Sequence, residues 1–176
     1  MNNRSYDAYL DIETTGLSPD ACPITVIGIH ICRDEMEEKF IQLIGDGITA
    51  EALLEALTGV GTIYTFNGER FDLPYIKHRL GVDLLAKGFT HCDLMHQCHR
   101  NGLYGGLKKI EPRLGISRRL TEVNGYEAVR LWWRYVNDFD QTALETLLEY
   151  NKEDTQNLKF LRHLIFCDTT PAKDVV

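Results

Sequence analysis

Two acidic residues near the start of the chain, Asp11 and Glu13, have the spacing of paired metal ligands on one strand. The residues around them alternate between apolar and polar, which is typical of a β-strand. Both side chains are therefore predicted on one face, about 6.6 Å apart at ~3.3 Å per residue. Carboxylate oxygens are the preferred ligands of hard divalent cations such as Mg²⁺ and Mn²⁺. An isolated Asp-x-Glu pair is more often an ordinary solvent-exposed strand face, so a metal site needs further ligands.

A further carboxylate, Asp154, lies in a long helical pattern over residues 141–166. Leu147 and Leu161 lie one heptad before and after it, which predicts Asp154 on the buried stripe of the helix. Tyr150 precedes Asp154 by one helical turn and lies on nearly the same face. A buried carboxylate needs a compensating cation, and its neighbours on the helix are polar rather than basic. A core aspartate held by hydrogen bonds alone is the alternative.

Asp72 stands at the start of a predicted helix, residues 71–80, shortly after a predicted strand over residues 62–66. Asn67 opens the turn between them and Gly68 continues it. A carboxylate in the first helical turn often does no more than complement the positive end of the helix dipole. That simpler interpretation suffices if the segment is taken alone.

Taken together, these segments resemble the three motifs of the DEDD superfamily of 3′→5′ exonucleases. The sequence DIETTGL from Asp11 to Leu17 resembles the first motif, and residues 67–72 resemble the second. Residues 150–154 resemble the third, in the Tyr-x-x-x-Asp form of the tyrosine subclass. Glu149 stands where the histidine subclass has its histidine. The nearest resemblance is to RNase H-like exonucleases related to the proofreading domain of family B DNA polymerases, over about residues 6–165.

This resemblance implies an enzyme that hydrolyses single-stranded DNA or RNA from the 3′ end and releases nucleoside 5′-monophosphates. It implies two divalent cations, Mg²⁺ or Mn²⁺, ~3.5–4 Å apart. Asp11 would bridge both cations, with Glu13 and Asp154 on the nucleophile side. Asp72 would support the leaving-group side, and Tyr150 would orient the attacking water.

The resemblance also implies substrate contacts. The backbone near Thr14 and Thr15 would hold the 3′ end, and Leu17 would lie against the terminal base. Asn67 would either contact the substrate strand or only shape the turn of the protein chain in which it lies. Two alternatives stay open: an RNase H-like endonuclease or structure-specific nuclease, and a non-catalytic nucleic-acid-binding module on the same fold, which the intact carboxylate set disfavours. The sequence does not choose between DNA and RNA, because no residue can be assigned to the 2′-hydroxyl.

The elements that must position these residues follow an α/β order. A meander of three strands comes first, and helices then alternate with further strands, which is typical of a mixed sheet flanked by helices. With the resemblance, this predicts an RNase H-like mixed five-stranded sheet. The predicted strands cover residues 6–13, 24–32, 39–44, 62–66 and 89–92, with an acidic hairpin loop over residues 34–38. The predicted helices run from the Thr49 cap to Leu57, over 71–80, in several pieces after Asp93, and over 141–166.

Charge is distributed unevenly along the chain. The net charge of −7 argues against a nucleic-acid binder when taken alone. Between Arg100 and Arg134, however, eight basic and three acidic residues give +5, which leaves −12 elsewhere. This predicts a phosphate-tracking segment, in which Lys108 and Lys109 follow a glycine-rich turn and contact phosphate. A solvated face without a ligand is the alternative.

A predicted helix in this segment carries two tryptophans. Trp133 continues an apolar stripe and is predicted to be a core residue, whereas Trp132 is predicted to pack within the domain rather than stack on a base. The stripe consists of Tyr126, Val129, Trp133 and Val136.

The cysteine pattern and chain length set the remaining expectations. Five scattered cysteines do not form a disulfide framework, and the Cys/His-rich residues 91–99 favour ordinary packing over a zinc site because no Cys-x-x-Cys pair occurs. We expect one domain over residues 1–167, with a frayed tail over 168–176. No apolar run is long enough to span a membrane, and no signal-peptide pattern is present, which predicts a cytoplasmic protein.

Overall fold

The computed structural model describes residues 6–33 and 37–167, the last residue by its backbone only. The predicted tail over residues 168–176 and most of the predicted acidic loop lie outside the described residues. Contrary to the prediction, Glu37 and Glu38 do not belong to the loop but begin the third strand. Within the described residues, no helix is both long and apolar enough to cross a membrane.

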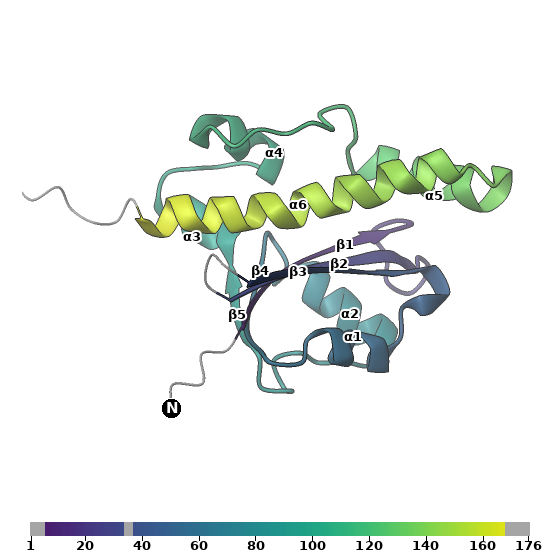
Figure 1. The fold of residues 1–176 in the computed structure, drawn as a ribbon, viewed down its shortest axis with the longest axis horizontal. Coiled ribbons are helices and arrows are strands. Elements are labelled where there is room, and N and C mark those ends of the chain that lie inside the picture. Colours follow the sequence, from purple (N-terminus) through teal and green to yellow (C-terminus); the bar gives the residue numbers. More distant parts are fainter. Residues whose placement is uncertain (1–5, 34–36, 168–176) are drawn as a thin grey trace, which may run out of the picture.

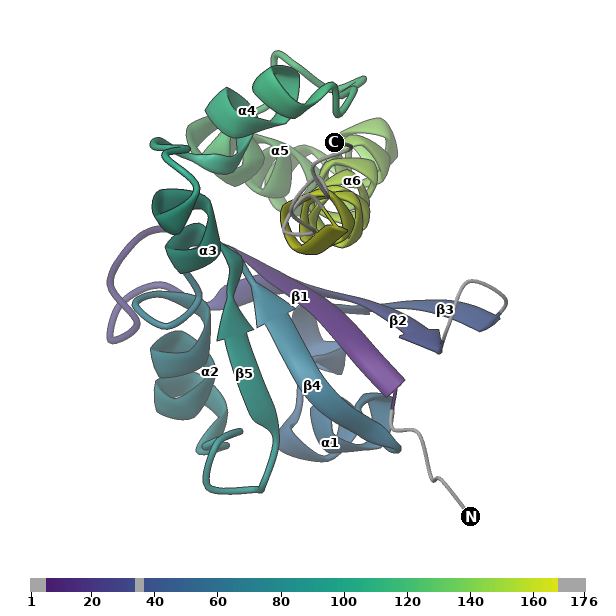
Figure 2. The ribbon, with the colours of Figure 1, turned by 90° about the vertical axis from the view of Figure 1, so that its left-hand side faces the viewer.

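Five strands form one mixed sheet in the order β3-β2-β1-β4-β5 (Figures 1 and 2). The central strand β1 pairs antiparallel with β2 and parallel with β4; β2 and β3 are antiparallel, and β4 and β5 are parallel. The predicted α/β class and the mixed five-stranded sheet are thus confirmed. The strands are β1 (Tyr6–Thr14), β2 (Ile24–Arg33), β3 (Glu37–Ile44), β4 (Val60–Thr65) and β5 (Thr90–Asp93).

Helices cover both faces of the sheet. In Figure 2, α1 and α2 lie on one face and α6 lies across the other. The helices are α1 (Ala50–Ala56), α2 (Asp72–Leu80), α3 (Leu94–Arg100), α4 (Leu107–Ile110), α5 (Gly125–Asp138) and α6 (Gln141–Cys167). Short 3₁₀ helices follow β3 and α4, namely η1 (Gly45–Gly47) and η2 (Glu111–Leu114).

Strand β1 separates two hydrophobic cores because its side chains alternate between the faces. Ala8, Leu10 and Ile12 are buried in the core beneath α1 and α2. Tyr9 points to the opposite face, where its ring stacks on Tyr64 at 5.2 Å between centroids and packs in the core beneath α3 and α6. The two acidic residues that follow on the same strand therefore share the α6 face.

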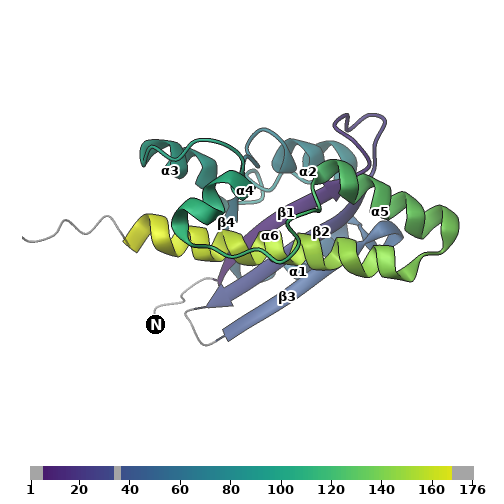
Figure 3. The ribbon, with the colours of Figure 1, turned by 90° about the horizontal axis from the view of Figure 1, so that it is seen from above.

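Helix α6 lies across β1 and β2 (Figure 3), and one close contact fixes its position. A Cβ atom added to Gly28 on β2 would lie 2.1 Å from Oδ1 of Asn151, so only glycine admits Asn151 there. Gln42 of β3 also donates to Asn151 Oδ1 at 3.0 Å. The middle of α6 is thereby held directly over the carboxyl half of β1.

Helix α5 presents a different face to the core from the one predicted. Its buried residues are Ala128 and Leu131, and Trp132 packs against the same cluster. Trp133 is 44% exposed, so its prediction as a core residue was wrong. The physical reason is that α5 packs mainly on one helix, α6. This contact buries only a narrow stripe of α5 side chains and leaves Trp133 outside it.

Candidate active site

The four predicted carboxylates come from three elements and meet at one place. Asp11 and Glu13 are on β1, Asp154 is on α6, and Asp72 is the first residue of α2. One oxygen from each of Asp11, Glu13 and Asp154 lies within 4.8 Å of the others. Asp72 joins them because its Oδ1 accepts the backbone N–H of Ile12 at 3.1 Å, between the two acidic residues of β1.

These carboxylates line a cavity of ≈650 Å³. Every catalytic residue predicted from the sequence lines it, and so do four of the six predicted substrate contacts. These residues are Asp11, Glu13, Asp72, Tyr150 and Asp154, with Thr14, Thr15, Leu17 and Asn67. Phe66, Phe71, Tyr126 and Val129 add apolar wall that the sequence did not assign to the site. The α5 stripe predicted as core therefore contributes its first two members to this cavity.

The end of β1 is shaped by a change of pairing register. The pairing with β2 shifts between Glu13 and Thr14, which is a bulge or a similar irregularity. Such irregularities are common beside functional sites because they change the direction of side chains. Here Glu13 stays buried, and the following residues leave the sheet as the loop that carries Leu17.

The turn before Asp72 is held by a carboxylate that the sequence analysis missed. Asp93, at the end of β5, accepts the N–H of Asn67 at 2.8 Å and that of Glu69 at 3.1 Å. Asn67 has a positive φ of 63°. A Cβ on Gly68 would lie 2.2 Å from Thr65 Oγ1, so the turn requires glycine there. Asn67 therefore shapes the turn, and it also lines the cavity.

Asn151 is a second site residue that the sequence motifs do not identify. Its Nδ2 donates to Asp11 Oδ2 at 3.0 Å and to the Asp11 carbonyl at 3.3 Å. The contact joins α6 to β1 across 140 positions of the chain. The Tyr-Asn dipeptide of the third motif, which places Asn151 beside Tyr150, is the signal that could have identified it.

Burial and mutual repulsion disfavour the charged forms of these carboxyls. The pKa of Asp11 is raised well above its ordinary value, first by burial and then by the charges of Asp154 and Glu13. The pKa of Glu13 is also raised well above its ordinary value, first by burial and then by the charges of Asp154 and Asp72. Burial raises the pKa of Asp72 to about 7, against the lowering effect of backbone hydrogen bonds. A cluster of this kind is stabilised by bound positive charge.

The compensating cation of Asp154 is Arg118, from the loop after η2. Its side chain is 5% exposed, and Nη2 forms an ion pair with Asp154 Oδ1. The same guanidinium makes a bidentate pair with Glu111, with Nη2–Oε1 at 2.6 Å and Nε–Oε2 at 2.8 Å. Burial raises the pKa of Asp154, and the Arg118 charge and a hydrogen bond from Tyr150 act against that rise. The sequence predicted such a cation without identifying it.

Tyr150 is buried beside the carboxylates. Burial, and next the charges of Asp154 and Glu13, raise the pKa of its phenol. The hydroxyl therefore keeps its proton at neutral pH and acts as a hydrogen-bond donor. Lys108 Nζ lies 4.6 Å from the centre of the Tyr150 ring. Within the described residues this buried ammonium has no hydrogen-bond partner.

No basic residue of the segment between Arg100 and Arg134 lines the cavity. Lys109 and Arg113 are exposed, and the cavity lining does not include Lys108 or Lys109. The remaining arginines with acidic partners form the ion pairs Arg119–Glu149, Arg130–Glu127 and Arg134–Asp140. Lys108 and Arg118 are therefore the two basic residues of the segment that we place beside the site.

The Cys/His-rich stretch over residues 91–99 has separate local contacts. Cys98 lies in the core beneath α3 and α6. His91 shares a hydrogen bond of 2.9 Å with Thr65, and His96 contacts Glu69 at 2.7 Å. The four cysteines whose side chains are described carry free thiols, namely Cys22, Cys32, Cys92 and Cys98.

Known proteins resemble the chain in sequence and in fold. A family model described as the RNase_H superfamily matches residues 8–166. The uncharacterized protein YprB of Bacillus subtilis (strain 168) is 28% identical over 171 residues, which covers 89% of this chain and 41% of YprB. The uncharacterized protein MJ0365 of Methanocaldococcus jannaschii is 29% identical over 164 residues, which covers 85% of this chain and 89% of MJ0365. The chain thus spans less than half of YprB.

A solved structure shares the fold over most of the chain. The family B DNA polymerase of the archaeon Pyrobaculum calidifontis superposes with a TM-score of 0.66 at 18% identity. The match covers 92% of this chain and 25% of the polymerase.

Proposed function

The chain belongs to the RNase_H superfamily, and on that premise we propose that it is a metal-dependent 3′→5′ exonuclease of the tyrosine subclass. Its substrate is a single-stranded DNA or RNA end, and its products are nucleoside 5′-monophosphates. One observation carries the proposal: three carboxylate oxygens from β1 and α6 converge within 4.8 Å, with Asp72 beside them, in one cavity. The resemblance of the three motifs gives the polarity and the subclass.

The donor set fits hard divalent cations. All four site carboxyls supply oxygen, the ligand that Mg²⁺ and Mn²⁺ prefer. Their raised pKa values indicate that burial disfavours their negative charges while no metal ion balances them. Asp11 would contact two cations, with Glu13 and Asp154 on one side and Asp72 on the other. When bound, the cations would stabilise the added charge at phosphorus and on the leaving alkoxide.

The other residues of the cavity bind and orient the substrate. The Tyr150 hydroxyl keeps its proton and donates a hydrogen bond to Asp154. When a cation binds Asp154, this single O–H would turn to the attacking water and donate to it rather than remove its proton. Leu17 is exposed at the cavity and offers an apolar surface to the terminal base, while the backbone at Thr14 and Thr15 holds the 3′ end. Lys108, which lies against the Tyr150 ring rather than in the cavity lining, would add a positive charge close to the scissile phosphate.

Digestion of end-labelled substrates tests the reaction and its direction. Single- and double-stranded DNA and RNA are incubated with Mn²⁺, Mg²⁺ or chelator. We expect stepwise shortening of 5′-labelled single strands, release of mononucleotides, and no reaction with chelator. Circular single strands of the same sequence should resist, because they have no end.

Three outcomes separate the proposal from its alternatives. Cleavage of circular strands would indicate an endonuclease, and a preference for one duplex junction would indicate a structure-specific nuclease. Binding without hydrolysis under every metal condition would indicate a non-catalytic module. The Asp11→Ala variant controls for a contaminating nuclease, because a folded protein without the shared ligand should be inactive.

A further inference from the structure

We propose that Arg118 is a positioning residue for Asp154, a role that rests on the metal-dependent function proposed above. Arg118 holds Oδ1 of Asp154, which restricts rotation of the carboxylate, and the second oxygen would then be the one that binds a cation. Arg118 itself binds no cation and does not line the cavity. It would act on the metal site only through its ion pair with Asp154.

The geometry of Arg118 is rigid. Its guanidinium is clamped by Glu111 through two parallel hydrogen bonds of 2.6 and 2.8 Å. Bidentate pairs of this kind fix both orientation and distance, because guanidinium and carboxylate are planar and complementary. The Glu111 side chain is 2% exposed. Asp154 therefore pairs with a cation that has almost no freedom to move away.

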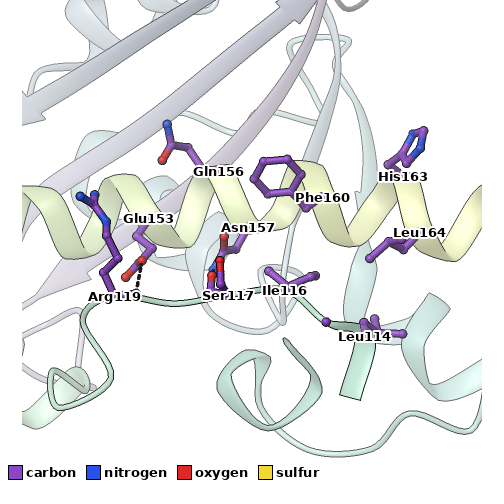
Figure 4. Close-up of a pocket in the computed structure, with 11 residues that line it drawn as sticks. Leu114, Ile116, Ser117, Arg119, Glu153, Gln156, Asn157, Phe160, His163 and Leu164 are labelled. Carbon is purple, nitrogen blue, oxygen red and sulfur yellow. Dashed lines mark hydrogen bonds between the residues drawn. The ribbon is translucent and has the colours of Figure 1, made fainter. Parts of the chain in front are cut away.

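Helix α6 itself holds the backbone on both sides of Arg118. The Glu153 carboxylate accepts the backbone N–H of Arg119 at 2.6 Å and that of Leu120 at 3.1 Å. Asn157 donates to Glu111 Oε1 at 2.8 Å and to the Ser117 carbonyl at 3.4 Å. Figure 4 shows Glu153 and Asn157 on α6 facing this segment. Two polar residues flanking Asp154 on α6 are thus used to place one loop arginine.

Stability alone is a weak explanation for this network. Burying each ion costs several kcal/mol of hydration, and apolar residues of similar volume often replace a buried ion pair without loss. The network nevertheless keeps Glu111 and Arg118 buried behind an expected metal ligand. Partners that orient metal ligands are worth about 10–100-fold in metal affinity or activity in other metal sites.

Charge and orientation predict opposite effects on cation binding. A positive charge beside Asp154 repels a divalent cation, so a purely compensating Arg118 would weaken binding, and its neutralisation would strengthen it. A positioning Arg118 strengthens binding by preorganising Asp154. Lysine keeps the charge and loses the planar fork, so Arg118→Lys isolates orientation.

The experiment compares Mn²⁺ binding and hydrolysis in Arg118→Lys and wild type. Mn²⁺ affinity is measured by electron paramagnetic resonance, and single-turnover rates are measured over a Mn²⁺ series. We expect Mn²⁺ binding about 10–100-fold weaker in Arg118→Lys, a matching rise in the Mn²⁺ concentration for half-maximal rate, and an unchanged substrate KM. Glu111→Gln, which weakens the clamp, should shift Mn²⁺ binding in the same direction by less.

Arg119→Lys is the matched control. The side chain of this neighbouring arginine is 74% exposed and pairs with Glu149 on the outer surface. The Arg119→Lys variant should therefore bind Mn²⁺ and hydrolyse substrate as wild type does. Folding of each variant is checked by circular dichroism. If Arg118→Lys fails to fold, Glu111→Gln decides the proposal in its place.

The outcomes keep this inference separate from the proposed function. Wild-type Mn²⁺ affinity and rate in Arg118→Lys would overturn the positioning role, and so would tighter Mn²⁺ binding in a folded Arg118→Met protein. Wild-type protein that binds Mn²⁺ no better than Asp154→Asn would overturn the metal-dependent function itself, and the positioning role with it.

Discussion

Each of three site carboxylates has a partner that fixes one of its oxygens. The partners are Asn151 for Asp11, the Ile12 amide for Asp72, and Arg118 for Asp154. A carboxylate held in this way loses little rotational freedom when a ligand binds, which is how preorganised sites limit the cost of reorganisation. None of the three partners carries a negative charge, so fixing the ligands adds no repulsion to the cluster.

Tyr150→Phe should slow hydrolysis by at most 10²–10⁴-fold, the range for one positioned hydrogen-bond or proton-transfer group. Phenylalanine keeps the ring contact with Lys108 and removes only the hydroxyl. Single-turnover rates at saturating Mn²⁺ measure the effect. Asp154→Asn should disturb Mn²⁺ binding more strongly, because it removes a charged ligand.

Tyr104→Phe is the control, since Tyr104 is exposed and does not line the cavity. If the Tyr150→Phe protein hydrolyses substrate as fast as wild type, Tyr150 has no role in the mechanism and only the four carboxylates remain as catalytic residues.

At the scale of residues, short motifs were predictable and long-range partners were not. Asp11, Glu13 and Tyr150 lie in patterns whose spacing is set by one strand or one helical turn. Arg118 follows no such spacing, because the loop that carries it has no periodicity. The only indication of a nearby cation was that a buried carboxylate such as Asp154 needs a positive charge beside it. Several arginines of the chain could have supplied that charge.

At the scale of elements, the site depends on how closely α6 approaches the sheet. Asn151 reaches Asp11 because Gly28 leaves room for its side chain. The apolar runs and heptad spacing predicted β2 and α6 themselves. They did not predict the contact between these elements. A glycine inside a strand permits a close approach but does not identify the residue that approaches.

Gly28→Ala should lower both stability and activity. The added methyl group overlaps Asn151 Oδ1, so α6 must shift or the side chain must turn away from Asp11. Overpacking of this type costs about 1–3 kcal/mol, and displacement of Asn151 should also reduce the hydrolysis rate. Chemical denaturation and single-turnover rates measure the two effects.

Gly47→Ala is a matched control, because a Cβ there meets no atom within 4 Å. Equal stability of Gly28→Ala and Gly47→Ala would show that the approach of α6 to β2 tolerates a methyl group and does not position Asn151.

Helix α5 shows where periodicity stops being informative. Its apolar residues occupy more of the circumference than the core uses, so two stripes compete for burial. Tertiary packing on α6 selects the stripe of Ala128 and Leu131 and leaves Trp133 exposed. The sequence of α5 alone contains no information about which neighbour it meets.

At the scale of the whole molecule, clustered acids link protonation to stability. In the metal-free protein, burial raises the pKa of Asp72 to about 7, from 3.8. Between these values the folded protein binds more protons than the unfolded chain, so the free energy of unfolding falls as pH rises. Asp11 and Glu13 shift in the same direction.

We therefore expect the melting temperature of chelator-treated protein to fall from about pH 5 to about pH 8. Mn²⁺ should raise the melting temperature more at the higher pH, because the ligands are then ionised. Differential scanning calorimetry measures both trends. Asp72→Asn should show a shallower pH dependence, and an equal slope in this variant would assign the effect to other groups.

The charge distribution also allows a test of the proposed binding of nucleic acid. Lys108, Lys109 and Arg113 form no ion pair within the described residues, unlike three of the neighbouring arginines. Replacing all three with Gln should weaken binding of single strands. It should also reduce the salt slope by about 2, at ~0.7 per lost phosphate contact. Fluorescence anisotropy in the inactive Asp11→Ala background measures both.

Arg130→Gln combined with Arg134→Gln is the control, because both arginines already pair with acids on the surface. Affinity and salt slope unchanged by the triple substitution would place residues 108–113 on a passive face.

The 140-position separation between Asp11 and Asn151 has a consequence for biosynthesis. A ribosome delivers β1 early and the carboxylate of Asp154 close to the end of the domain. A nascent chain that stops before α6 lacks Asp154, Tyr150 and the anchor of Asp11, although it already carries Asp11, Glu13 and Asp72. The partly translated polypeptide is therefore expected to carry an incomplete carboxylate set, and the proposed active site is completed only when α6 emerges and folds onto β1.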